Sequence, residues 1–152
     1  MLELVDALDG RIHRLDDRVK RLVQGDSEAE RLQTWPGIGV FGAALLLAEI
    51  GTIRRFQSAH ELAAYAGLTP STQSSGDKTR HGSVGRAGSP WLKWILIEIV
   101  QSLKLAPGPV GDHYQKLLRA KGKAKATVAA ARKLCCYLYW CLKEGASGFR
   151  VG

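Results

Sequence analysis

The sequence predicts an all-α fold, in which an N-terminal coiled-coil helix precedes a helical domain with a helix-hairpin-helix-like motif. Residues 4–23 repeat apolar side chains at heptad spacing. Several later segments begin at helix-capping residues and end at glycine, and no segment shows a convincing strand alternation. We expect residues 1–27 to form a coiled-coil dimerisation helix, 28–145 a helical domain and 146–152 a tail.

The first predicted helix carries an apolar stripe with β-branched residues at every a position and leucine at every d position: Val5, Leu8, Ile12, Leu15, Val19 and Leu22. This combination favours parallel two-stranded coiled coils. Arg11 at a g position would then face Asp16 of the partner. The stripe therefore predicts a homo-oligomer, a dimer or tetramer, held through residues 4–23. An amphipathic helix that packs on its own domain is the alternative.

A glycine turn joins the next two predicted helices. A short helix over 28–34 leads into Pro36-Gly37-Ile38-Gly39, and an apolar helix follows up to Gly51. In a helix-hairpin-helix the free N–H groups at the start of the second helix can bind a phosphate. Gly37 and Gly39 would let that phosphate approach the backbone closely. A core hairpin without a ligand fits the same residues equally well.

Four more helices are expected after the hairpin, over residues 58–67, 91–105, 112–120 and 126–143. Ser58 and Glu61 form a capping box for the first of these helices, and Gly67 is placed to end it. Ser89-Pro90 begins the second, which is apolar on nearly every face and is expected to be buried. The prolines at 107 and 109 are expected to end it. The aromatic residues of these helices are expected in the core: Trp91, Trp94, Tyr137, Tyr139 and Trp140.

Charge is spread unevenly along the 152 residues, which carry a net +8. Residues 1–34 hold eight acids and six bases, so the remainder carries +10. A domain this basic indicates a polyanionic partner, most often nucleic acid. The densest basic run is expected to contact phosphates, although a solvated face is the alternative; it includes Lys121, Lys123 and Lys125.

No apolar run reaches the ~20 residues that span a membrane, and the N-terminus lacks an apolar signal core. We therefore expect a cytoplasmic protein with no membrane partner. Cys135, Cys136 and Cys141 match no metal-ligand spacing. They are predicted to be buried thiols, and no metal site is predicted in the chain.

The segment between residues 71 and 90 is rich in glycine, serine and arginine. Ser74 and Ser75 lie there among Lys78, Arg80 and Arg86. A hydroxyl surrounded by cations suits a nucleophile that attacks a phosphate. A plain flexible loop has the same composition, and no base or acidic cluster accompanies the serines. The residues alone predict phosphate binding with a candidate nucleophile, Ser75 or Ser74, but no complete active site.

A series of short motifs follows in a specific order: PGIG (36–39), AEIG (48–51), RF (55–56), LAAYAGLTP (62–70), SSG (74–76) and GRAGSPWLK (85–93). Over roughly residues 30–143 this series resembles the C-terminal domain of the insertion-sequence transposases of the IS one-ten / one-sixteen / nine-oh-two group. That group includes the pilin-gene invertases. Where the family usually has Ser-Lys-Arg-Gly, this chain has residues 85–88 as Gly-Arg-Ala-Gly, and one basic position is lost.

The resemblance implies a DNA recombinase acting in transposition. In such proteins an N-terminal RNase H-like domain binds Mg²⁺ through four acids, and a serine at the position of Ser74-Ser75 attacks DNA. It also implies DNA and a structured guide RNA as partners, and assembly into dimers or tetramers. The four-acid domain is absent here, so we expect a truncated form, inactive alone, with no cofactor of its own. The alternative function is a non-enzymatic helix-hairpin-helix module that binds nucleic acid.

Overall fold

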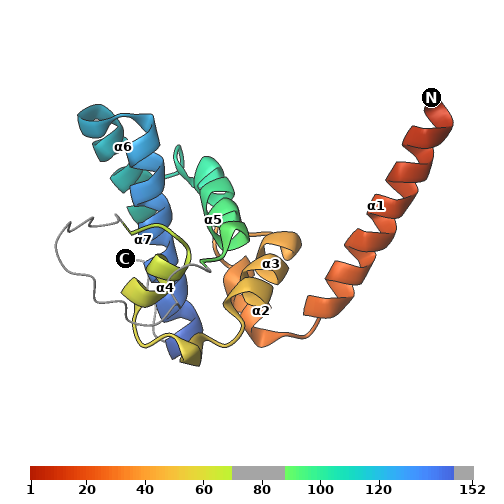
Figure 1. The fold of residues 1–152 in the computed structure, drawn as a ribbon, viewed down its shortest axis with the longest axis horizontal. Coiled ribbons are helices and arrows are strands. Elements are labelled where there is room, and N and C mark those ends of the chain that lie inside the picture. The colour runs from red at the N-terminus through yellow and green to blue at the C-terminus, as the bar shows by residue number, and fades with distance from the viewer. Residues whose placement is uncertain (70–87, 146–152) are drawn as a thin grey trace, which may run out of the picture.

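The computed structural model describes residues 1–69 and 88–145, and every regular element in these ranges is a helix (Figure 1). The all-α prediction is therefore confirmed. In chain order the elements are α1 (Leu2–Val23), α2 (Ser27–Gln33), α3 (Val40–Ile50), the 3-10 helix η1 (Ile53–Arg55), α4 (Ala59–Tyr65), α5 (Pro90–Leu103), α6 (Pro109–Lys121) and α7 (Lys123–Glu144).

The long helix α7 is the centre of the core. It contacts α2, η1, α4, α5 and α6, and its inward residues are almost completely buried: Ala126, Ala130, Leu134 and Leu138. Their spacing of four places them on one face of the helix. Tyr139 is also buried, and its hydroxyl donates to the Phe56 carbonyl oxygen at 3.2 Å and accepts from Lys143 Nζ at 2.7 Å. Because its polar end is satisfied, this ring can lie deep in the core.

Helices α3 and α5 pack side by side in opposite directions. The turn before α3 lies against Ser102 near the end of α5, and Glu49 near the end of α3 contacts Ser89 at the start of α5. The expected burial of α5 on nearly every face is wrong, because α3, α6 and α7 cover only part of the helix. Trp91 and Trp94 are 61% and 44% exposed, and their rings meet edge to face at 6.1 Å.

Two of the other aromatic residues that were expected in the core also lie nearer the surface. Trp140 is 41% exposed, although the neighbouring Tyr139 is buried. Tyr137 is half-buried, and its ring stacks on Trp35 with the centroids 5.8 Å apart. The core prediction was therefore correct for Tyr139, and it was wrong for the tryptophans of α5 and α7.

The boundaries of α6 and α7 differ from the prediction. Pro109 does not merely follow α5 but begins α6, where its fixed φ and missing N–H suit the first helical turn. Only Gly122, at a φ of +82°, separates α6 from α7. Lys121, Lys123 and Lys125 therefore belong to helices and not to a linker.

Helix α1 extends away from the other helices (Figure 1). It contacts α3, and it is buried at Val23 and half-buried at Val19. Most of its apolar stripe is exposed, with solvent-accessible fractions near one half: Val5 48%, Leu8 49%, Ile12 53% and Leu15 58%. Packing of the whole stripe on the chain's own domain, the alternative drawn from the sequence, is therefore wrong. Pairing as a coiled coil stays a prediction.

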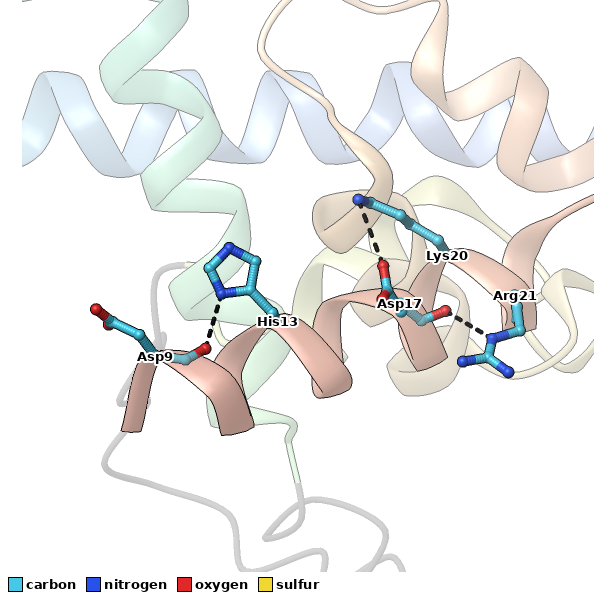
Figure 2. Close-up of polar contacts among 5 residues, drawn as sticks. All are labelled: Asp9, His13, Asp17, Lys20 and Arg21. Carbon is cyan, nitrogen blue, oxygen red and sulfur yellow. Dashed lines mark hydrogen bonds and ion pairs between the residues drawn. The ribbon is translucent and has the colours of Figure 1, made fainter. Parts of the chain in front are cut away.

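The polar side chains of α1 interact within the helix itself (Figure 2). His13 Nδ1 lies 2.8 Å from the Asp9 carbonyl oxygen, and Arg21 Nε donates to the Asp17 carbonyl oxygen at 3.3 Å. Lys20 Nζ lies 3.9 Å from the Asp17 carboxylate. These contacts stabilise the helix locally and involve none of its apolar stripe.

Within the described ranges, none of the helices combines the length and the hydropathy that a membrane span requires.

Candidate nucleic-acid interface

We call residues 70–87 the serine loop. Its predicted site residues lie outside the described part of the chain: Ser74, Ser75, Lys78, Arg80 and Arg86. What the structure describes is the pair of segments that carry the loop, the end of α4 and the start of α5.

The two ends of the serine loop are held together. The backbone N–H of Ser89 donates to the carbonyl oxygen of Tyr65, the last residue of α4, at 2.9 Å. Gly67 directly follows the C-cap of α4 and has a φ of +68°, as suits the glycine that the sequence predicted at the end of this helix. A Cβ on Gly88 would lie only 2.7 Å from the same Tyr65 oxygen, so this close approach requires glycine. The described segments on either side of residues 70–87 therefore meet at one place.

Ser89 fixes this place to a third helix. Its hydroxyl accepts from the Leu92 N–H at 3.0 Å, which caps α5, and it donates to Glu49 of α3 in a short hydrogen bond. Ser89 is a buried polar residue, with 6% of its surface exposed, and both of its hydrogen-bonding roles are satisfied. Ser89, two residues after the serine loop, is thus joined to α3, α4 and α5 at once.

Arg55 lies beside the same junction. Its guanidinium carbon is 4.7 Å from the centroid of the Phe56 ring and 4.8 Å from that of the Tyr65 ring, which is the geometry of a cation–π contact. Gly51 lies beside this group, with an Arg55 terminal nitrogen 3.7 Å from its Cβ position, and its φ of +66° favours glycine there.

We call this cluster the loop base: Glu49, Gly51, Arg55, Phe56, Tyr65, Gly88 and Ser89. Its members come from four of the six sequence motifs, which are up to 40 residues apart along the chain. Sequence reasoning named Ser89 only as a helix cap and did not assign roles to Glu49 or Tyr65. The signal that could have found them was their position inside the short motifs of the series, where no local role explains a polar or aromatic residue.

The two glycines of the hairpin turn have different surroundings. Gly37 has a φ of +82°, and a Cβ there would lie 3.0 Å from Ser102 Cβ, so close packing on α5 already accounts for this glycine. Gly39 is the N-cap of α3 and has no atom within 4 Å of the Cβ position. The Cβ position of Gly39 is therefore open among the described residues, while the phosphate-binding hairpin itself stays a prediction.

The predicted lysines gather where α6 meets α7. Lys121, Lys123 and Lys125 are all exposed, and none of them pairs with a carboxylate in the described part of the chain. On the same helices, burial and then the charges of Lys133 and Lys116 lower the pKa of His113. We call these three lysines the lysine corner. The lysine corner lies at the start of α7. Tyr139, which contacts Phe56 of the loop base, lies about 24 Å further along the axis of the same helix.

The cysteines are not arranged as ligands. Burial and the neighbouring Cys136 raise the pKa of the Cys135 thiol to about 12, and burial also raises the pKa of Cys136. Among residues 1–69 and 88–145, no three His, Cys, Asp or Glu side chains gather closely enough to hold a metal ion.

A cavity of about 280 Å³ opens between the end of α2, the start of α6 and the end of α7. Its walls are mainly apolar, and Arg31 contributes a guanidinium whose Nε is buried without a hydrogen-bond partner among the described residues. None of the described residues predicted to bind phosphate lines this cavity.

Residues 29–115 match the model of a protein family described as the transposase IS116/IS110/IS902 family. Among curated proteins, the chain is 32% identical over 144 residues to a putative transposase, y4pF/y4sB, of Sinorhizobium fredii; the match covers 91% of this chain and 37% of that protein. It is 29% identical to a probable family 20 transposase of Pseudomonas aeruginosa, and that match covers 97% of this chain and 45% of that protein.

A third relative is the pilin gene-inverting protein of Moraxella bovis, 32% identical with 88% of this chain and 44% of that protein covered. The chain thus spans less than half the length of these relatives. No solved structure matches the chain. Because the family model covers more than half of the sequence, the chain belongs to the transposase IS116/IS110/IS902 family.

Proposed function

We propose that this chain is the DNA-binding, serine-bearing part of a transposase that acts in DNA transposition. The observation that carries the proposal is the loop base, where four motifs of the family converge to hold both ends of the serine loop. A segment that presents a nucleophile must be held in a defined position, because misplacement by 1 Å can cost about a hundredfold in rate.

In this proposal the hydroxyl oxygen of Ser75 or Ser74 attacks a DNA phosphorus atom. A serine Oγ–P bond forms as the hydroxyl gives up its proton, the P–O bond to one deoxyribose breaks, and the released sugar oxygen takes up a proton, so that the protons balance. Lys78, Arg80 and Arg86 stabilise the negative charge on the transferring phosphate. The described residues form no Mg²⁺ site. We therefore assign the metal to the part of the longer relatives that this chain does not span.

DNA would also contact the helical domain away from the serine loop. Lys121, Lys123 and Lys125 are exposed and unpaired among the described residues, and the N–H groups at the start of α3 lie next to the open space at Gly39. Cations and free N–H groups at a helix start are typical phosphate ligands. The same groups can bind a structured guide RNA, which we propose as the second partner.

Residues 4–23 would join two copies of the chain as a parallel coiled coil. The exposed stripe of α1 supports this, and the charges beside it favour one orientation. In a parallel pair Arg11 faces Asp16 of the partner, whereas an antiparallel pair would place arginines opposite arginines and aspartates opposite aspartates.

The nucleophile can be tested in a chimaera that joins this chain to the remaining part of the Pseudomonas aeruginosa relative. We expect a covalent protein–DNA adduct that survives denaturation and is lost in the Ser74→Ala/Ser75→Ala double variant. The two single variants identify which hydroxyl reacts. An adduct of undiminished yield in the double variant would rule out both serines.

A second candidate function is a non-enzymatic helix-hairpin-helix module, which the open space at Gly39 favours. It predicts salt-dependent DNA binding by the chain alone and no adduct in the chimaera. Adduct formation that depends on Ser74 or Ser75 would exclude this candidate.

A further inference from the structure

We infer that Arg55 of the loop base is a nucleic-acid phosphate ligand, one that the charge pattern of the serine loop does not include. The inference rests on the proposed function, because it takes nucleic acid to be the partner of this chain. Arg55 is the last residue of η1, and its side chain is exposed.

The guanidinium of Arg55 is held in place before any ligand binds. It contacts the rings of Phe56 and Tyr65 at 4.7 and 4.8 Å, and the two ring centroids are 5.4 Å apart with a tilt of 51°. Stacking on ring faces leaves the N–H groups along the edge of a planar guanidinium available. Such a fork matches two oxygens of a phosphate, and less side-chain entropy is lost on binding because the group is already positioned.

No carboxylate neutralises this cation within the described ranges. The two acids of the surrounding elements are already engaged as acceptors. Glu49 accepts the Ser89 hydroxyl, and Glu61 accepts the backbone N–H of Gln57 at 2.7 Å. Among the described residues, no carboxylate therefore competes with an external anion for the guanidinium of Arg55.

Arg55 lies close to the segments that flank the serine loop. Its guanidinium lies on the ring of Tyr65, and the carbonyl oxygen of the same Tyr65 holds Ser89. Lys93 adds a second cation on this side, since its Cδ lies 3.8 Å from the Cβ position of Gly67. A phosphate bound by Arg55 would therefore lie near Ser89, which follows the serine loop in the chain.

Arg54 provides a matched control. It belongs to the same 3-10 helix and is also exposed, and it has no ring contact among the described residues. Arg54→Ala and Arg55→Ala remove the same charge from adjacent positions. The experiment is a titration of a short DNA duplex, and in parallel of an RNA duplex of the same sequence, with the wild-type chain and each variant at several salt concentrations.

We expect Arg55→Ala to weaken binding about tenfold, as the loss of a charge-assisted hydrogen bond would. Its slope of log affinity against log salt should shrink by about 0.9, the value for one phosphate contact. Arg54→Ala should change affinity less than threefold, roughly the effect of a screened surface charge. Arg55→Lys should still bind more weakly than wild type, because a lysine has no fork of N–H groups. The affinity of Tyr65→Leu should fall between those of wild type and Arg55→Ala.

The outcomes separate this inference from the proposed function. A wild-type chain that binds neither duplex at low salt contradicts the proposed function and the inference with it. If the wild type binds and Arg55→Ala behaves like Arg54→Ala on both duplexes, the inference alone is wrong. Selective loss on one duplex supports it and identifies that nucleic acid as the source of the phosphate. Far-ultraviolet circular dichroism and the melting temperature confirm that each variant is folded.

Discussion

At the scale of single residues, Ser89 joins three helices close to the serine loop. Its backbone N–H donates to the carbonyl oxygen of Tyr65. Its hydroxyl donates to the carboxylate of Glu49 and accepts from the backbone N–H of Leu92. Only the helix-capping contact follows from local sequence. The bond to Glu49 joins residues 40 positions apart, and no sequence rule gives that pairing.

Replacement of Ser89 should cost more than replacement of an ordinary helix cap. Ser58→Ala is the matched control, because Ser58 caps α4 through the Glu61 N–H at 3.1 Å and is exposed. We expect about 1 kcal/mol of destabilisation for Ser58→Ala. For Ser89→Ala we expect about 2–4 kcal/mol, since Glu49 also loses its partner. Urea denaturation measures both; equal losses would show that the Glu49 contact contributes nothing.

His113 predicts a pH dependence of stability. Burial, with Lys133 and Lys116, lowers its pKa in the folded chain below the ordinary 6.5, so just below pH 6.5 the unfolded chain binds the proton more readily. The stability that neutral His113 provides is thus present above about pH 6.5 and is lost as the pH falls toward the folded-state pKa. We expect wild type to lose more stability than His113→Gln between about pH 7 and pH 5. Parallel losses in thermal melts of the two proteins would contradict this.

At the scale of elements, α1 is the helix that the sequence predicted best. Its heptad repeat needs only neighbouring turns of one helix, and the observed span Leu2–Val23 contains the whole stripe. The junction of α6 and α7 was predicted less well. The expected helices left residues 121–125 between them, yet a single glycine with a positive φ lets one helix follow another directly.

The exposed stripe of α1 should govern self-association. Leu8→Asn/Leu15→Asn places polar groups at two successive d positions, and we expect the dimer to dissociate at least tenfold more readily. Gly10→Ala should act in the opposite direction and strengthen the dimer by up to about 1 kcal/mol per helix, because alanine favours the helix more than glycine does. The new Cβ fits, since it meets only an Arg14 nitrogen at 3.8 Å. Sedimentation equilibrium tests both, and a wild-type chain that stays monomeric at high concentration would exclude this pairing.

At the scale of the whole molecule, basic groups occupy two separate regions. The loop base and the lysine corner lie about 24 Å apart along α7. Because the two regions share no residues, their contributions to nucleic-acid binding should be nearly additive.

Removal of the lysine corner should reduce the salt dependence of DNA binding. In Lys121→Ala/Lys123→Ala/Lys125→Ala we expect the slope of log affinity against log salt to shrink by up to about 2.7, or 0.9 for each phosphate contact. The control is Arg14→Ala/Lys20→Ala/Arg21→Ala, which removes three exposed charges from α1. Equal slopes for the two triple variants would indicate that the lysine corner contributes only net charge.

The sequence by itself determined the helical class, the caps at Ser58 and Ser89, the apolar stripe of α1 and the motif series of the family. Each of these depends on residues within a few turns of one another or on their order along the chain. Only the tertiary structure decided that Trp91 and Trp94 are exposed, that Gly37 packs on Ser102, and that Glu49, Arg55 and Tyr65 meet at the ends of the serine loop. Such contacts depend on how whole helices pack against one another, and local hydrogen bonding and periodicity do not fix that arrangement.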